Sequence, residues 1–172
     1  GGDTDTLNAS GDLSGATITD VEHLRVGNGQ SITVTSAQLN AFQTVSYSGS
    51  QSGAGMTINL ATAGSVGGNV TGQSFGTFTG SSGADTIDVS GTLGGQNGQG
   101  WTLNAGDNAG GNTLIGASTD DTLNSGEGAD TLQGGGGNDN LNGNGGADTL
   151  YGGGGNDNIN AGDGSDTLYG EA

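Results

Sequence analysis

The sequence lacks cysteine and proline altogether, and Arg25 is the only Lys or Arg among its 172 residues. Without cysteine there is no disulfide and no thiolate metal site. Without clustered basic residues the chain cannot neutralise nucleic-acid phosphates, and it has little attraction for an anionic membrane surface. No apolar run approaches the roughly 20 residues that cross a bilayer. The sequence therefore argues against nucleic-acid binding and against membrane insertion.

Hydrophobic residues are scarce as well. They make up 28% of the chain, whereas globular domains have about 45–50%. The chain also has 41 glycines and a formal net charge of −17 at pH 7. This composition is typical of disordered chains, because too little apolar surface is buried to offset chain entropy. If the chain folds, we expect a positively charged ligand to be part of the structure.

What the chain does have is a nine-residue repeat. An aspartate returns every nine residues in its second half, at Asp121, Asp130, Asp139, Asp148, Asp157 and Asp166. Two residues after each aspartate stands a large apolar residue, namely Leu123, Leu132, Leu141, Leu150, Ile159 and Leu168. Asn112 lies at the position of the repeat nine residues before Asp121. Asp85 lies three repeats before Asn112, in a repeat-like unit near residues 80–88.

Each nine-residue unit is interpreted as a six-residue turn followed by a short strand. Side chains alternate along a strand, so the apolar residue points inward while its neighbours point outward. One apolar residue per unit cannot be buried alone. Stacking every second unit creates two parallel sheets whose leucine columns face each other, with eighteen residues in each coil. Glycines in the turns supply positive φ angles and let backbone carbonyls come close together.

The same stacking places the aspartates in two rows. Successive coils lie only about 4.8 Å apart, so unscreened carboxylates would repel one another strongly. Two carboxylates with turn carbonyls form an all-oxygen cage. Such a cage suits Ca²⁺, which takes six to eight oxygen ligands at about 2.3–2.6 Å, whereas Zn²⁺ would favour His or Cys. The ligand chemistry therefore predicts several bound calcium ions.

The repeat resembles the RTX pattern G-G-x-G-x-D-x-U-x, in which U is a large apolar residue. Gly134–Asn142 and Gly152–Asn160 match every position, whereas Gly116–Asn124 has Ser118 and Thr119 in its turn. The resemblance implies a right-handed parallel β-helix or β-roll over residues 105–172, with calcium between turns eighteen residues apart. The implied metal ligands are Asp85, Asn112, Asp121, Asp130, Asp139, Asp148, Asp157 and Asp166, with the turn residues Gly126, Gly128, Gly135, Gly137, Asn144, Gly146, Gly153, Gly155, Gly162 and Gly164.

Residues 1–104 lack the nine-residue period but alternate in the manner of strands. Runs at residues 18–26, 31–42, 44–49, 56–60 and 75–80 are separated by Gly, Ser and Asn. We expect an irregular β-solenoid segment with longer coils, whose core is thickened by Phe42, Met56, Phe75 and Phe78. A separate small β-domain is the alternative. The stretch TSAQLNAF could form one short turn or helix.

The sequence shows no catalytic arrangement. His23 lies in a strand-like run beside charged residues, without the oriented pocket that a nucleophile system needs. We therefore expect a non-enzymatic protein. Trp101, Tyr151 and Tyr169 could form an aromatic strip that contacts a cell-surface polysaccharide.

The family resemblance implies a secreted or cell-surface bacterial protein that folds on meeting calcium outside the cell. The irregular first half resembles segments of surface-layer proteins and adhesins. The alternative is the C-terminal calcium module of a protease or lipase exported by type I secretion. Repeat-like units stand near both ends, so we expect either a piece of a longer array or end-to-end self-association into a fibre. The chain begins at Gly1 without Met, so it is expected to be a mature product, a fragment, or cargo with its signal elsewhere.

Overall fold

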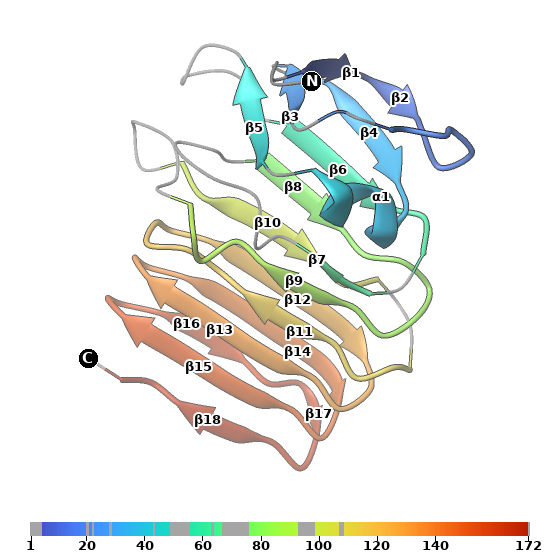
Figure 1. The fold of residues 1–172 in the computed structure, drawn as a ribbon. Coiled ribbons are helices and arrows are strands. Elements are labelled where there is room, and N and C mark those ends of the chain that lie inside the picture. The colour runs from blue at the N-terminus through green and yellow to red at the C-terminus, as the bar shows by residue number, and fades with distance from the viewer. Residues whose placement is uncertain are drawn as a thin grey trace.

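The computed structural model describes residues 5–19, 21, 23–27, 29–42, 44–48, 56–62, 64–66, 76–92, 99–106 and 109–171. The protein is all-β, with 53% strand and 4% helix, and winds as a parallel β-solenoid of about seven turns (Figure 1). This confirms the fold class expected from the sequence. Among the residues that the structure describes, no helix has the length and apolar character needed to cross a membrane.

Three parallel sheets run along the solenoid. The broad sheet contains β2 (Gly11–Asp12), β4 (Ser31–Val34), β6 (Met56–Leu60), β8 (Gly76–Thr79), β10 (Trp101–Asn104), β12 (Thr122–Glu127), β14 (Asn140–Gly146), β16 (Asn158–Asn160) and β17 (Asp163–Gly164). The narrow sheet contains β7 (Ser65–Val66), β9 (Thr86–Asp88), β11 (Thr113–Ile115), β13 (Thr131–Gly136), β15 (Thr149–Gly154) and β18 (Thr167–Tyr169). The N-terminal sheet contains β1 (Thr6–Ala9), β3 (His23–Gly27) and β5 (Thr44–Ser48). From β6 onward the chain alternates between the broad and narrow sheets, so each coil contributes one strand to each.

The C-terminal coils follow the nine-residue repeat. In the broad sheet Leu123 pairs with Leu141, and in the narrow sheet Leu132 pairs with Leu150. These four leucines are fully buried, because alternation turns them inward from both sheets. The strands run further than expected, into the turns, since turn residues such as Gly126 and Asn144 also pair across coils.

The N-terminal coils are longer and have larger core residues. Phe42, Met56 and Phe78 are buried as expected, whereas Phe75 lies outside the described residues. Trp101 is buried beside Phe78, with ring centroids 6.3 Å apart. Aromatic side chains thus supply much of the buried apolar surface in this part of the solenoid.

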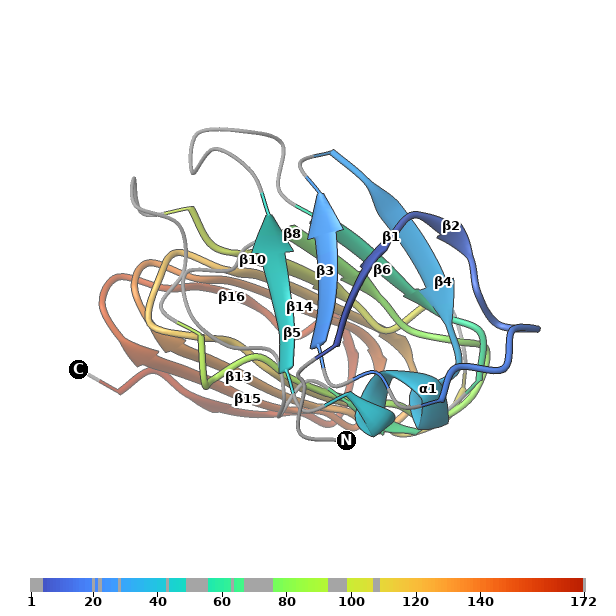
Figure 2. The same cartoon turned by 45° about the horizontal axis from the view of Figure 1, so that its top comes forward.

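The expected short helix is present as α1 (Ser36–Ala41), which connects β4 to β5. Thr35 and Gln38 form a capping box, in which the Thr35 side chain accepts from the Gln38 N–H at 3.1 Å and the Gln38 side chain accepts from the Thr35 N–H at 2.8 Å. Figure 2 shows the coils nested one behind another, with α1 at an edge of the solenoid. Since β10 pairs with both β8 and β12, the two halves share one sheet, and the division at residue 104 stays a prediction.

Candidate metal sites in the turns

Each repeat aspartate is held by the coil that precedes it. Its Oδ1 accepts a hydrogen bond from the backbone N–H eighteen residues earlier. The donor–acceptor pairs are Asn112–Asp130 at 2.6 Å, Asp121–Asp139 at 2.7 Å, Asp130–Asp148 at 2.9 Å, Asp139–Asp157 at 2.9 Å and Asp148–Asp166 at 3.0 Å. This ladder fixes each carboxylate at the end of its turn and aligns the two predicted rows.

In three aspartates the second carboxylate oxygen, Oδ2, accepts no hydrogen bond from the described part of the chain. The Oδ2 atoms of Asp130, Asp139 and Asp148 are buried and have no hydrogen-bond partner among the residues that the structure describes. The three side chains are only 2%, 2% and 1% exposed. A buried, unpaired charge is costly unless an opposite charge compensates it. These atoms therefore mark positions where a cation would be stabilising.

Backbone carbonyls share the space of these oxygens. A Cβ added to Gly143 would lie against both the Oδ2 of Asp148 and the carbonyl oxygen of Ala161, in the next coil. A Cβ on Gly134 would meet Asp139 and the carbonyl of Gly152 in the same way. The turns of Asp139 and Asp148 thus form cradles lined by one carboxylate oxygen and a carbonyl oxygen, and the glycines at their first positions leave these cradles open.

The predicted turn residues have the backbone conformation that the repeat requires. Positive φ angles, from 66° at Asn144 to 145° at Gly164, occur at Gly126, Gly128, Gly135, Gly137, Asn144, Gly146, Gly153, Gly155, Gly162 and Gly164. Asn144 is the one non-glycine among them, and asparagine tolerates the left-handed region better than most residues. At Gly146 a side chain would also collide with the carbonyl oxygen of Gly128.

Burial and repulsion shift the carboxylate pKa values upward. The pKa of Asp139 is raised to about 7, mainly because burial disfavours its charged form. The Asp121 N–H opposes this shift, and the negative charges of Asp121 and Asp157 reinforce it. Burial also raises the pKa of Asp148. A bound cation would reverse this effect by favouring the ionised carboxylates.

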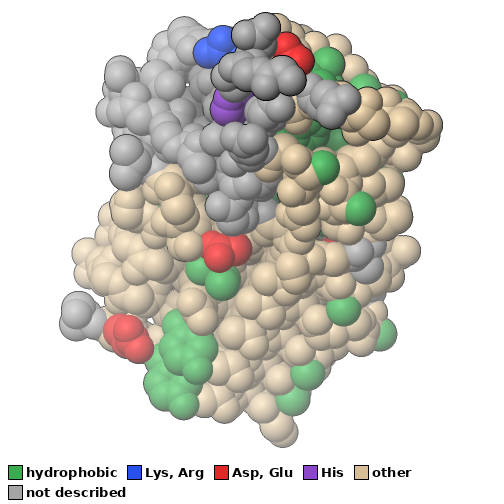
Figure 3. Space-filling model, viewed as in Figure 1, with side chains coloured by type: hydrophobic (Ala, Val, Ile, Leu, Met, Phe, Trp, Pro, Cys, Tyr) green, Lys and Arg blue, Asp and Glu red, His purple; other side chains and the backbone are tan. Residues whose placement is uncertain are grey.

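The donor set fits a hard cation. Within the described ranges, no place gathers three or more His, Cys, Asp or Glu side chains that could hold a metal. A cation in a turn would therefore depend on carboxylate and carbonyl oxygens, and such oxygen-only cages suit Ca²⁺. Figure 3 shows few acidic side chains on the viewed face, in keeping with the burial of the turn carboxylates.

The remaining predicted ligands have different surroundings. Asp157 and Asp166 belong to the last coil and are partly exposed. Asp85, Asn112 and Asp121 are each 2% exposed, and they continue the same ladder: Asp121 accepts from the Trp101 N–H, Asn112 from the Asp85 N–H and Asp85 from the Gly64 N–H. The structure thus brings all eight predicted side-chain ligands into one pair of rows. They differ in whether the side-chain atom outside the ladder has a hydrogen-bond partner.

Sequence reasoning missed two sets of residues around these rows. Ala117 and Ser81 donate hydrogen bonds to Asp121 and Asp85, mainly through backbone N–H groups that leave no sequence signature. A ladder of side-chain amides also runs along the broad sheet, joining Asn104, Asn124, Asn142 and Asn160. This ladder could have been predicted from the Asn residue that directly follows several of the inward apolar residues.

The comparisons with known proteins agree with this geometry. The model of the RTX calcium-binding nonapeptide repeat, with four copies, matches residues 106–141 and 142–172. No curated protein and no solved structure matches the chain. The C-terminal part is therefore an array of RTX repeats folded as a parallel β-roll, a class of structural calcium-binding fold typical of secreted bacterial proteins.

Proposed function

We propose that this chain is a calcium-dependent structural β-roll of a secreted or cell-surface bacterial protein, such as a surface layer, adhesin or fibre. The observation that carries the proposal is the set of three buried, unpaired carboxylate oxygens at Asp130, Asp139 and Asp148. The turns of Asp139 and Asp148 also place a backbone carbonyl beside the unpaired oxygen, and all three turns have the left-handed residues of the RTX repeat.

The chain's own residues explain why folding would depend on calcium. At −17 formal charge, with aspartates stacked in rows, the chain repels itself when no cation is bound. Ca²⁺ in the turns neutralises these carboxylates, and its binding free energy becomes folding free energy. Calcium is scarce in the cytosol and abundant outside the cell, so the chain would remain unfolded for export and fold after secretion.

End-to-end association is the second part of the proposal. The last coil exposes Leu168 by 48% and Tyr169 by 45%, although the leucines above Leu168 in the same column are fully buried. The edge of β18 that faces away from β15, together with this apolar surface, favours the addition of a further coil, from neighbouring repeats or from another copy. Sedimentation at increasing protein concentration tests it: a particle of constant monomeric mass in millimolar calcium would contradict self-association.

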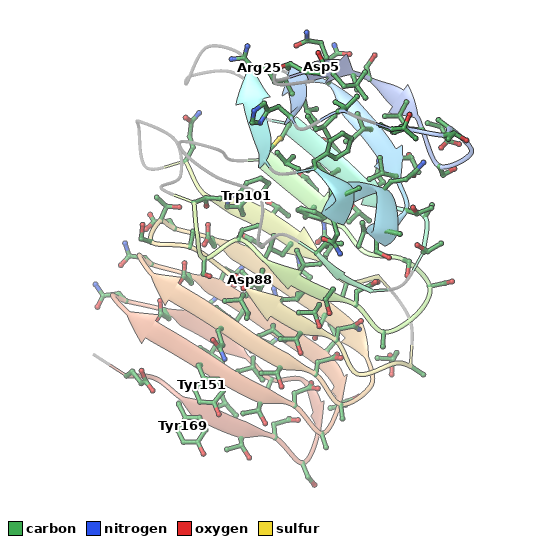
Figure 4. The ribbon with its side chains drawn as sticks, viewed as in Figure 1. Asp5, Arg25, Asp88, Trp101, Tyr151 and Tyr169 are labelled. Carbon is green, nitrogen blue, oxygen red and sulfur yellow. The ribbon has the colours of Figure 1, made fainter. Side chains whose placement is uncertain are left out.

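A cell-surface polysaccharide is the third proposed partner. Tyr151 and Tyr169 stack with ring centroids 4.8 Å apart, on the outside of the narrow sheet (Figure 4). Tyr151 borders a hollow of about 280 Å³ that Gln133 and Glu171 also line. Aromatic surface with a few polar groups is typical of small-molecule and sugar sites. Binding to a glycan array that is abolished by Tyr151→Ala would support this partner. If the unaltered chain binds no glycan on the array, the polysaccharide partner is refuted.

Far-UV circular dichroism tests the central proposal. We expect the β-sheet signal of the chain to increase on addition of millimolar Ca²⁺ and to fall again with EDTA. Mg²⁺ at the same concentration should have much less effect, because Mg²⁺ demands a tighter octahedral site. Identical spectra in calcium and in EDTA would refute the proposal.

A further inference from the structure

We propose that the calcium requirement of this chain begins at residue 125. Three enclosed calcium sites are formed by the turns of Asp130, Asp139 and Asp148, whereas in the turns of Asp85, Asn112 and Asp121 a hydrogen-bond donor of the protein takes the place of the ion. This inference rests on the proposed function and specifies which turns of the solenoid need calcium.

The clearest case is Asp121. Its Oδ2 accepts a hydrogen bond from the N–H of Ala117 at 2.6 Å, within its own turn. Neither Ala117 nor Thr119 has a positive φ, although the corresponding residues of the following turns do. The Ala117 N–H therefore points at the same carboxylate oxygen, Oδ2, that has no partner among the described residues in the turns of Asp130, Asp139 and Asp148. A backbone donor there repels a cation and at the same time satisfies the carboxylate.

Asp85 is satisfied in a second way. Its Oδ2 accepts from the N–H of Ser81 at 2.7 Å and from the Ser81 hydroxyl at 3.0 Å, while its Oδ1 accepts from the Gly64 N–H at 3.0 Å. Three donors thus satisfy both oxygens of this buried carboxylate without a cation. No unpaired oxygen remains on this side chain, in contrast to Asp130.

Asn112 is the third case in which a hydrogen-bond donor of the protein takes the place of the ion. Its side-chain carbonyl accepts from the Asp85 N–H at 2.9 Å, as an aspartate would, and its NH₂ group donates to the carbonyl of Gly110 at 3.0 Å. Gly110 occupies the fourth position of its repeat, so this hydrogen bond closes within the turn of Asn112 itself. The amide thus supplies both the acceptor and the positive end of a dipole, and at this position of the row Asn112 has no charge for a cation to neutralise.

The other end of the array sets the second limit. Asp130, Asp139 and Asp148 lie in turns that are covered by a complete later turn, at residues 143–148, 152–157 and 161–166. Asp157 and Asp166 have no complete turn after them in this chain, and both are partly exposed. Within these 172 residues the enclosed, unsatisfied positions are therefore the three identified by their unpaired oxygens.

This arrangement has a consequence for folding. The coils up to residue 124 combine self-satisfied turns with the large core residues, including Phe78 and Trp101. These coils need no ion in their turns, so they would fold first. Their last strands, β11 and β12, would then offer unpaired edges to β13 and β14. The calcium-requiring coils would then add to this edge in sequence order, each held by the N–H ladder to the coil before it.

Native mass spectrometry of the full chain in limiting calcium tests the number of sites, with two matched variants from the same row. Asp139→Asn removes an unsatisfied carboxylate and should lower the count of tightly held ions from three to two. Asp121→Asn, one coil earlier, should keep all three, although it weakens the bond from Ala117. More than three tightly held ions in the unaltered chain, or loss of an ion in Asp121→Asn, would overturn the inference.

Hydrogen exchange of the unaltered chain in EDTA provides a second measurement that does not depend on the variants. Amides of β8 and β10 should remain protected while those of β13 and β15 exchange rapidly, and calcium should protect both. Rapid exchange throughout in EDTA would refute a calcium-independent first half. If the chain binds no calcium and both halves stay protected in EDTA, the proposed function itself fails, which is a different result.

Discussion

The two halves of the solenoid have the same parallel coils but close them by different means. In the C-terminal half each coil is eighteen residues long, with left-handed glycine turns and buried carboxylates that have an unpaired oxygen. In the N-terminal half the ladder partners are 20, 21 and 27 residues apart, and the turn carboxylates are satisfied by the protein. In these turns hydrogen-bond donors of the protein, mainly backbone N–H groups, satisfy the carboxylates.

The difference shows what a metal contributes to a solenoid. Burying one leucine contributes about 1.5–3 kcal/mol, and ordering the backbone of only two residues costs about as much. A nine-residue unit with one leucine therefore cannot fold on apolar burial alone. Longer coils escape this limit because residues such as Trp101 and Phe78 bury far more surface. Short coils are regular and can be extended indefinitely, but under the function proposed above they need calcium to fold.

Removing a large core residue should have the greatest effect and should separate the halves. Phe78→Ala is expected to cost about 3–5 kcal/mol, because it leaves a cavity beside Trp101 in the part that folds without calcium. In EDTA the protected strands β8 and β10 should then be lost, as measured by hydrogen exchange. Leu141→Ala is the control from the thin core: it should leave the EDTA pattern unchanged and lower only the stability of the calcium form.

A turn glycine provides a test confined to the C-terminal half. At Gly155 φ is 124°, and a Cβ would collide with the carbonyl oxygen of Gly137, so Gly155→Ala should destabilise the calcium form by about 3 kcal/mol. The adjacent Gly154 has nothing within 4 Å of an added Cβ, and Gly154→Ala should be neutral. Calcium titrations followed by circular dichroism would measure both. Equal midpoints for the two variants would show that the close approach of the coils is not required.

Acidity should affect the C-terminal half in the same sense as calcium, because both remove negative charge from the buried carboxylates. The pKa of Asp139 is raised to about 7 in the folded chain, from an ordinary value of 3.8, so between these values the folded state holds a proton that the unfolded state has lost. The stability of the roll in EDTA should therefore fall as pH rises from about 4 to 7, and acidification should partly replace calcium. Circular dichroism in EDTA at pH 5 and pH 8 measures this. Asp139→Asn should weaken the dependence, whereas a β signal that decreases on acidification would contradict it.

The sequence predicts the two halves to very different extents. Between residues 121 and 168 the period alone identifies the buried leucines, the turn glycines and the two carboxylate rows, because each coil repeats the last. The strands of the N-terminal half could be placed from alternation, but not the coil lengths, since these depend on contacts such as that of Trp101 with Phe78. The hydrogen bond from Ala117 to Asp121 could not be predicted either, because any residue carries a backbone N–H. Only the Ser118 and Thr119 substitutions indicated that this turn was unusual.

The smallest expected effect concerns the outer surface of the last coils. Tyr151 and Tyr169 stack at an interplanar angle of 6°, whereas the residue above them in the column, Gln133, has no ring. Such aromatic pairs contribute about 0.5–1.5 kcal/mol beyond the area they bury. We therefore expect Tyr169→Leu to lower the unfolding midpoint of the calcium form by a few degrees, roughly 2–4 °C per kcal/mol for a chain of this size.

A double-mutant cycle separates the stacking from the loss of apolar area. Tyr151→Leu, Tyr169→Leu and the combined variant keep an apolar side chain on the narrow sheet, so their non-additivity reports the ring contact itself. We expect a coupling of about 0.5–1.5 kcal/mol in calcium and none in EDTA, where the coils that hold the two rings at 4.8 Å are not formed. A coupling that persists in EDTA would show that these coils fold without calcium, and it would remove the distinction between the two halves.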